Sequence, residues 1–354
     1  MFFASNSIPT PEIVWWALIP VIVFSVSGVL LLTVSSLLKK EVSWLAPGVS
    51  LTAGIFVLLS SIPMWNRIQN DGPISFLNNS VGTDGSTIFL TSLIAIALIS
   101  TSILARPYLS REGIPDLEFY VLLLLSAAGG VVMAGANDLI VLFLGIEILS
   151  IAVYVLVALH LRKIESQEAA IKYFLLGAFS SAFLLYGIAL VYGAVGTTNL
   201  IGIRNFLTTS LLIEDGMLMI GFALMLVGLG FKVAVFPFHA WTPDAYQGAP
   251  TPVVIWMAAG VKVAGFAAIL RVFPLTFASY VDDWQIPLAV LSGLSVVFGS
   301  VVAVVQTNVK RMLAYSSIAH AGFILIGVQS SNMDGTAAVL FYLGVYTFLA
   351  SGSF

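Results

Sequence analysis

Eleven apolar blocks of about 20 residues each restrict the fold most, because about 20 apolar residues cross a bilayer as one α-helix. A transmembrane β-barrel would show shorter segments of alternating polarity, and the sequence shows no such pattern. We therefore predict an all-α, polytopic membrane protein with about 11 transmembrane helices. The candidate spans cover residues 13–38, 43–64, 87–105, 119–136, 139–161, 169–193, 216–239, 252–272, 285–305, 312–328 and 336–354.

The composition agrees with a membrane protein and limits the function classes. Of the 354 residues, 59% are hydrophobic and 9% are charged, whereas soluble domains carry about 25% charged residues. The net charge of −3 argues against nucleic acid as a partner. The segment before the first block lacks a basic region and a small-residue cleavage site, so we expect a retained span rather than a removed signal peptide.

The chain has no cysteine and three histidines. The lack of cysteine excludes disulfides, thiolate-bound iron–sulfur clusters and covalently attached haem. The histidines, His160, His239 and His320, lie in different segments, and two haems held by paired histidines would need more of them. We therefore expect no cofactor on this chain and assign any redox chemistry to another polypeptide.

Basic residues are unevenly divided between the two sets of loops. If the N-terminus lies outside, the inside loops hold eight of them and the outside loops hold three, which are Arg67, Arg204 and Arg271. This excess follows the positive-inside rule and predicts that the N-terminus is outside. The inside residues are Lys39, Lys40, Arg106, Arg111, Arg162, Lys163, Lys310 and Arg311.

Three charged residues lie well inside the apolar blocks, at membrane depth, where each costs roughly 3 kcal/mol or more. They are Glu147 in the fifth block, Lys232 in the seventh and Lys262 in the eighth. Charges of opposite sign in neighbouring spans suggest a path for charge, most simply for protons.

The seventh block carries the residues of a broken helix. Gly228, Gly230 and Pro237 bracket Lys232, and proline removes a backbone hydrogen bond and kinks a helix. Interrupted helices beside buried charge are typical of transporter sites. The freed carbonyls can bind the water that a proton needs.

Two connecting segments differ from plain loops. Residues 239–252 are rich in proline and aromatic residues, so we expect a stiff segment that can turn back toward the membrane where protein covers it. Asp244 is expected to organise that segment through local hydrogen bonds. Residues 200–212 are expected to form a short interfacial helix. Asp138, in a tight turn between spans, is most simply a helix cap.

Each buried charge also has a structural interpretation. Glu147 can be a neutral carboxyl held for packing, or a proton-holding group tuned by a nearby lysine. Lys262, near the middle of its span, can serve helix packing alone or carry a proton. Lys232 lies close enough to its span's end to extend its amine to the surface. The alternatives stay open at this point.

Three further candidates are weaker. Lys172 lies four residues after Glu168, which favours an interfacial ion pair as much as a relay role. His239 and His320 can shuttle protons near neutral pH, because histidine titrates there. Each can also be a packing residue in a helix.

Three stretches at these positions resemble subunit N of bacterial proton-pumping NADH:quinone oxidoreductase, which is respiratory complex I. A fourth stretch, 310–320, is shared more widely with antiporter-like subunits. The match runs from the fourth span to the last residue, and the first three spans are generic. The three stretches are residues 145–150, 168–179 and 236–252.

The resemblance implies inverted five-helix repeats, each with a broken helix, in the membrane arm beside subunits M and K of a bacterial plasma-membrane complex. It also implies that NADH, FMN, iron–sulfur clusters and quinone are bound by other subunits, whose chemistry drives proton movement. Glu147 then becomes a modulating carboxylate, Lys232 a switch, and Lys262 the central proton site, linked by water to His320. The implied parts are a three-helix segment (1–105), a first repeat (106–272) and an incomplete second repeat (273–354).

One departure from the family bears on function. Its members continue for further helices, which include a second broken helix with another central lysine. We therefore expect this polypeptide to be incomplete relative to them and do not expect autonomous pumping. The alternatives are a subunit of a multisubunit cation/proton antiporter and a structural scaffold with immobile charges.

Overall fold

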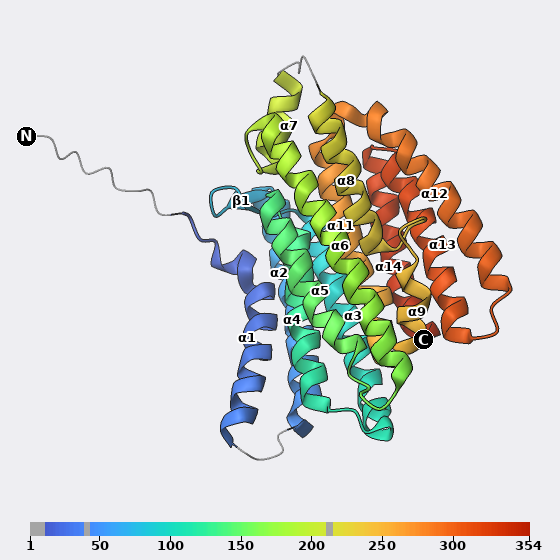
Figure 1. Cartoon of the computed structure of the whole chain (residues 1–354). Coiled ribbons are helices and arrows are strands. Elements are labelled where there is room, and N and C mark those ends of the chain that lie inside the picture. The colour runs from blue at the N-terminus through green and yellow to red at the C-terminus, as the bar shows by residue number, and fades with distance from the viewer. Residues whose placement is uncertain (1–10, 39–42, 210–214) are drawn as a thin grey trace, which may run out of the picture.

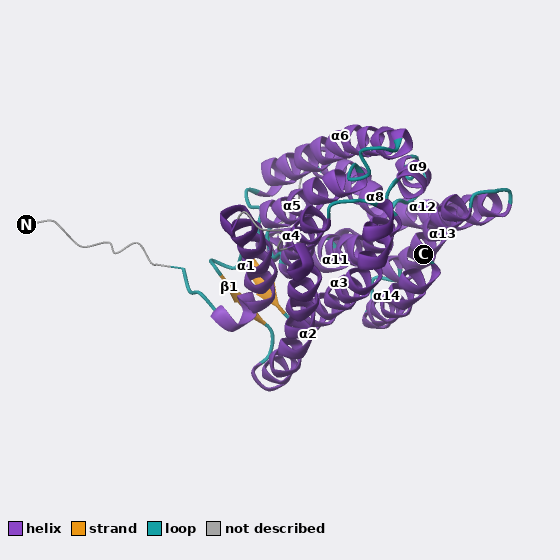
Figure 2. Ribbon diagram, turned by 90° about the horizontal axis from the view of Figure 1, so that it is seen from below, coloured by secondary structure: helices purple, strands orange, loops and turns teal. Residues whose placement is uncertain are grey.

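The computed structural model describes residues 11–38, 43–209 and 215–354, which are mostly helical (Figures 1 and 2). Eleven helical segments in this part are long and apolar enough to cross a membrane, as predicted, although several ends differ from the expected ones. Ten are α1 (Trp15–Leu38), α2 (Ala46–Asp71), α3 (Gly85–Glu112), α4 (Asp116–Gly135), α5 (Leu139–Val157), α6 (Ile164–Val195), α8 (Gly216–Val233), α12 (Val281–Val304), α13 (Val309–Gln329) and α14 (Met333–Ser353).

The remaining span is a composite segment that we call span 8. It consists of α10 (Thr251–Trp256), the π-helical turn η2 (Met257–Val261), α11 (Lys262–Leu270) and the π-helical turn η3 (Arg271–Thr276). Its most apolar 18-residue stretch is entirely buried, and α11 packs against α3, α4, α8 and α14. Span 8 is therefore the central helix of the bundle, and π turns of this kind occur frequently at functional sites.

The predicted break in the seventh span is confirmed, but it comes earlier than expected. Helix α8 ends at Val233 rather than near His239, because Ala234 is left-handed with a φ of 62°. The N–H groups of Ala234 and Val235 then bond to the carbonyls of Phe231 and Gly230, which ends the helix. The stiff segment that follows contains a short helix, α9 (Trp241–Gly248).

One end of the bundle carries a β-hairpin that we did not predict. Strands β1 (Ile74–Phe76) and β2 (Val81–Thr83) pair antiparallel between α2 and α3. Helix α7 (Leu200–Thr209) lies at the same end (Figure 1). It confirms the expected short helix as far as Thr209, and residues 210–212 lie outside the described part. We call this end the hairpin end. The 3₁₀ turns are η1 (Ser43–Leu45) and η4 (Ala278–Tyr280).

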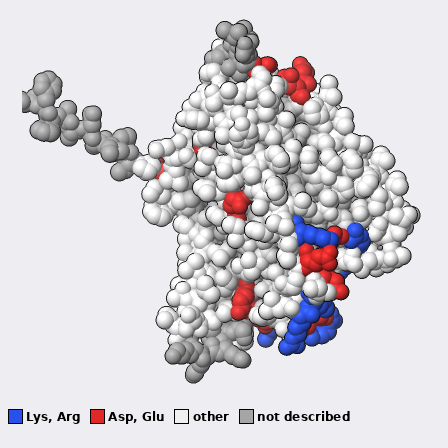
Figure 3. Space-filling view, viewed as in Figure 1, with Lys and Arg blue, Asp and Glu red and all other residues white. Residues whose placement is uncertain are grey.

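The opposite end, which we call the basic end, holds most of the described inside-loop cations. On the face shown in Figure 3, Lys and Arg gather in its lower half, away from α7. Lys39 and Lys40 lie outside the described residues. Seven of the described residues that we expected in loops lie in helices instead, which are Arg67 in α2, Arg106 and Arg111 in α3, Arg204 in α7, Arg271 in span 8, and Lys310 and Arg311 in α13. The outside position of the N-terminus stays a prediction, and so does the three-part division.

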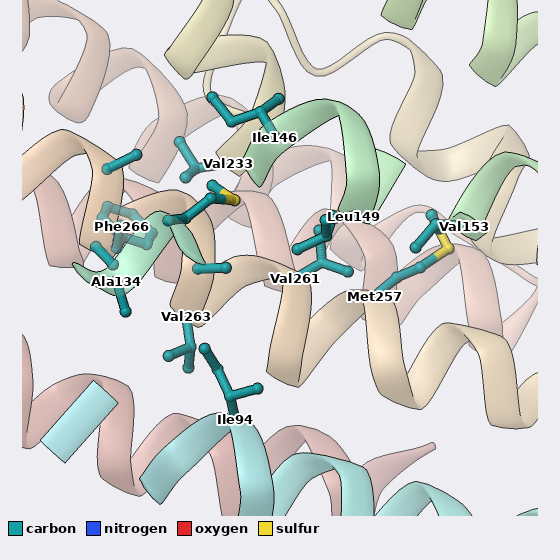
Figure 4. Close-up of a cluster of buried hydrophobic side chains, with 14 of the residues drawn as sticks. Ile94, Ala134, Ile146, Leu149, Val153, Val233, Met257, Val261, Val263 and Phe266 are labelled. Carbon is teal, nitrogen blue, oxygen red and sulfur yellow. The ribbon is translucent and has the colours of Figure 1, made fainter. Parts of the chain in front are cut away.

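The apolar core surrounds span 8. Figure 4 shows side chains of α3, α4, α5 and α8 packed on Met257, Val261, Val263 and Phe266 of this span. By contrast, α6 and α12 carry exposed large apolar residues on their outer faces, as expected for a surface that faces lipid. The predicted cap of α5 is confirmed, because Asp138 accepts hydrogen bonds from the first N–H groups of that helix.

Candidate functional site

Lys262 lies at the first turn of α11, 3% exposed. Its Nζ donates to the Ser317 carbonyl at 2.6 Å and to the Ser317 hydroxyl. It also lies 5.3 Å from the centre of the Tyr346 ring, a cation–π distance. A lysine from span 8 therefore meets residues of α13 and α14 in the interior. Ring and carbonyl stabilise its ammonium form.

His320, on α13, also lies beside Tyr346. Its Nδ1 is 2.7 Å from the Tyr342 hydroxyl, and its ring centre is 5.0 Å from that of Tyr346. Tyr346 therefore contacts both Lys262 and His320. The structure brings these two predicted residues to the same aromatic ring.

Lys232 lies in the last turn of α8 and is 7% exposed, so it does not extend to the surface. Its Nζ donates to the Ser150 hydroxyl at 2.7 Å, and Ser150 in turn donates to the Ile146 carbonyl of α5. The amine is therefore buried against a serine of another span, and its role in proton movement stays a prediction.

Glu147 lies one turn before Ser150 on α5. Its carboxylate accepts a hydrogen bond from Ser181 of α6 and forms no ion pair within 4 Å with Lys232, although both belong to the described part. The side chain is only partly buried, and its neighbour Ile148 is exposed. Glu147 and Lys232 are therefore joined through one turn of α5 rather than by an ion pair.

Lys172 belongs to a separate cluster near the basic end. It pairs with Glu168 at 2.7 Å, the helical pair expected from their spacing, and with Asp244 at 2.9 Å. Arg311 pairs with the same Asp244 at 2.6 Å. These residues line a pocket of about 200 Å³ together with Gln247. The expected local role of Asp244 is wrong, because its partners come from α6 and α13.

The electrostatics of this cluster keep Asp244 charged. Partial burial acts to raise its pKa, but hydrogen bonds from Lys172 and Arg311 outweigh that effect, so the pKa of Asp244 is below its ordinary value. The carboxylate therefore holds α6, α9 and α13 together at neutral pH.

His239 is 8% exposed and lies in the segment between α8 and α9. Its ring packs 5.3 Å from Phe236 and 4.8 Å from Phe298. Its Nδ1 has no hydrogen-bond partner among the described residues. The structure therefore places His239 in an aromatic surrounding next to α12, without a direct contact to Lys232 or Lys262.

Five residues of this arrangement escaped the sequence reasoning. Serine and tyrosine are common in apolar spans, so their presence alone does not indicate a site. Only their spacing from a charged residue could have identified them. Ser150 lies three residues after Glu147, on the same helix face, and Ser317 lies inside the 310–320 stretch. Tyr342 and Tyr346 share a face of α14 in the same way. The five residues are Ser150, Ser181, Ser317, Tyr342 and Tyr346.

No group of three or more His, Cys, Asp or Glu residues in the described ranges is placed to hold a metal ion. The arrangement is instead one of single amines, hydroxyls and an imidazole in a protein interior, which can hold and pass protons. The expectation that cofactors are carried by other subunits stays a prediction.

Known proteins match this chain over most of its length. Residues 136–354 match the family described as NADH:quinone oxidoreductase/Mrp antiporter, TM. NADH-quinone oxidoreductase subunit N of Trichlorobacter lovleyi is 41% identical over 337 residues, which cover 95% of this chain and 68% of that relative.

Two solved structures agree with these sequence matches. A chain of respiratory complex I from Thermus thermophilus has a TM-score of 0.78 at 35% identity and covers 94% of this chain and 68% of that chain. A chain of the Mrp complex from Dietzia sp. DQ12-45-1b has a TM-score of 0.82 at 19% identity, covers 96% and 63%, and shows a shared fold alone. The chain belongs to the NADH-quinone oxidoreductase subunit N family.

Proposed function

We propose that this chain is a proton-translocating membrane subunit of an NADH:quinone oxidoreductase. Protons pass through Glu147, Lys232, Lys262 and His320, while NADH oxidation and quinone reduction take place on other subunits. The observation that carries the proposal is the buried contact of Lys262 and His320 with the same tyrosine, Tyr346. Membership in the subunit N family is the basis for proposing that proton movement is coupled to quinone reduction.

The chemistry follows from the contacts. The ammonium of Lys262 is stabilised by one hydroxyl, one carbonyl and one ring, so it holds a proton without an ion pair that would fix its charge. His320 and Tyr342 offer the next polar atoms. Lys262 bonds to Ser317 and His320 bonds to Tyr342, with no direct hydrogen bond between the two in the described residues, so transfer needs a bridging water or a change of rotamer.

Glu147 on α5 and Lys232 on α8 influence proton transfer at Lys262 through their charges. The charge on Glu147 attracts an ammonium on α8 across the turn of α5, and such an attraction weakens when water enters and raises the local dielectric constant. Lys172 and His239 complete the proposed set, Lys172 at the basic end where protons enter and His239 beside the break after α8.

The proposed setting is a bacterial plasma membrane with the N-terminus outside, beside M-like and K-like subunits of the same complex. An antiporter subunit is the less supported alternative, because similarity to the Mrp complex is at 19% identity, whereas the subunit N relative is at 41%.

Substitution of Lys262 by alanine tests the proposal in membranes of the complex that contains this chain. We expect normal assembly and electron transfer with loss of proton pumping per electron through this subunit. Lys163→Ala is the control, since Lys163 pairs with Glu112 at the surface, and it should pump normally. If Lys262→Ala impairs only assembly and the assembled complex pumps fully, the chain is a scaffold.

A further inference from the structure

Arg271 is a second buried cation of span 8, near its hairpin end. It is 6% exposed. Its Nε donates to the Ala134 carbonyl of α4, and its Nη2 donates to the Thr87 hydroxyl and, at 3.1 Å, to the Asp84 carboxylate. The guanidinium is therefore held by three residues on or next to helices α3 and α4 and cannot move without breaking these bonds.

Two cavities meet at this ion pair. A cavity of about 460 Å³ lies at the hairpin end, under the hairpin and α7. A second cavity of about 180 Å³ lies between α3, span 8 and the start of α14. Asp84, Arg271 and Leu275 line both. The ion pair therefore lines both of these open cavities at the hairpin end, and each has room for water.

The second cavity reaches residues of span 8 that lie between Lys262 and Arg271 in the sequence. Ala267 and Leu270 of α11 belong to its lining. Ala267 comes five residues after Lys262, which is about 7.5 Å of helical rise. The hairpin-end surface, the Arg271 pair and the proton site therefore follow one another along the same helix.

Arginine has the chemistry of a barrier on such a route. Its guanidinium has five N–H donors and no acceptor and stays protonated in proteins, so it neither accepts nor releases a proton. A fixed arginine excludes protons in membrane pores for this reason, together with its charge. A lysine or histidine at the same place would be able to relay a proton.

We infer that Arg271, held by Asp84, closes the direct route between Lys262 and the aqueous phase at the hairpin end. A proton on Lys262 then leaves toward His320 and not straight out through this chain. The inference rests on the proposed function, since it assigns a direction to the same site. Arg271 is a positioning residue that acts on the proton path without holding the proton.

Passive proton flux tests the inference. Membrane vesicles that carry the complete complex are given a pH gradient without NADH, and the decay is followed with a pH-sensitive dye. Arg271→Gln and Asp84→Asn should each raise the flux several-fold. The double variant Arg271→Gln with Lys262→Ala should return the flux to the unsubstituted level, because the leak passes through Lys262.

Two further variants separate a barrier from a structural anchor. Arg67→Gln is the matched control, because Arg67 lies near the same end, over the Trp16 ring and outside both cavities; its flux should not change. Arg271→Lys keeps the charge but can relay a proton, so a barrier predicts a leak and an anchor predicts none. If the Arg271→Gln complex does not assemble, the proton flux of the Arg271→Lys complex is the test.

The inference is overturned if assembled Arg271→Gln and Arg271→Lys complexes show no extra flux, or if the leak persists in the double variant. Its failure is distinguishable from failure of the proposed function. If the Lys262→Ala complex still pumps during NADH oxidation, the proton site itself is rejected. If the Lys262→Ala complex loses pumping as expected but the Arg271 variants show no leak, only the barrier is rejected.

Discussion

Two buried cations on span 8 are stabilised in different ways. Arg271 has a carboxylate partner in Asp84, whereas Lys262 has no carboxylate within 4 Å in the described ranges. A buried ion pair fixes a charge, because removal of one partner leaves the other uncompensated. The hydroxyl, carbonyl and ring around Lys262 stabilise its ammonium without a carboxylate that would fix the charge, which suits the proposed proton carrier.

Ser150 is the residue whose loss should affect Lys232 most. Ser150→Ala removes the acceptor of the Lys232 ammonium, and a hydrogen bond to a charged group contributes about 1.5–3 kcal/mol. We expect a lower thermal unfolding temperature and slower pumping. Ser60→Ala is the control, because the Ser60 hydroxyl bonds only to its own helix, and an unchanged Ser150→Ala protein would contradict the assigned contact.

At the scale of elements, the π turns of span 8 depend on close packing at a glycine. A Cβ at Gly260 would lie 2.3 Å from the Trp256 ring, and Trp256 donates to Ser126 of α4 at 2.8 Å. The turn before Lys262 therefore tolerates only glycine without rearrangement. Its geometry is tied to α4 through the tryptophan.

Gly260→Ala should destabilise the protein by about 1–3 kcal/mol, because the tryptophan must move and lose its bond to Ser126. The measurement is thermal unfolding of the purified protein in detergent. Gly293→Ala in α12 is the matched control, since nothing lies near its Cβ position. Equal effects at the two glycines would show that the Trp256 contact does not hold span 8.

The cluster that joins α6, α9 and α13 gives a pH dependence. The pKa of Asp244 is lowered from 3.8 by Lys172 and Arg311 against the opposing effect of burial. A lowered folded-state pKa contributes stability that is present above the unfolded pKa and is lost as pH falls through the folded value. We expect this contribution, about 1 kcal/mol for a partly exposed pair, to persist down to about pH 4.

Asp244→Asn tests the same cluster. The variant should unfold at a lower temperature than the unsubstituted protein at pH 7, and the difference should vanish as the pH falls well below 4. A difference that stays constant into strong acid would mean that the ion pairs do not carry the effect.

Sequence patterns predicted the transmembrane helices better than they predicted the contacts between side chains of different helices. Span number and the break after Lys232 follow from local apolar runs and from proline. The hairpin escaped prediction because each strand has three residues, too few for an alternating pattern. Arg271 was assigned to a loop because it follows an apolar run, but its partners Asp84 and Thr87 lie almost 190 residues away in sequence. Such long-range pairing leaves no local pattern.

At the scale of the whole molecule, the charge distribution predicts its orientation in the membrane. The chain has no cysteine, so single cysteines can be placed at each end. Thr208→Cys on α7, at the hairpin end, should react with a membrane-impermeant maleimide from outside intact cells. Arg162→Cys at the basic end should react only after the cells are opened. The reverse pattern would invert the orientation.

The central claim is that Lys262 holds and releases a proton while remaining inside the bundle. Lys262→Arg tests it most directly, because arginine keeps the positive charge but does not release its proton. With the complex assembled and electron transfer intact, we predict that the number of protons pumped per electron falls as it does for Lys262→Ala. An Lys262→Arg complex that pumps the normal number of protons per electron would contradict the claim.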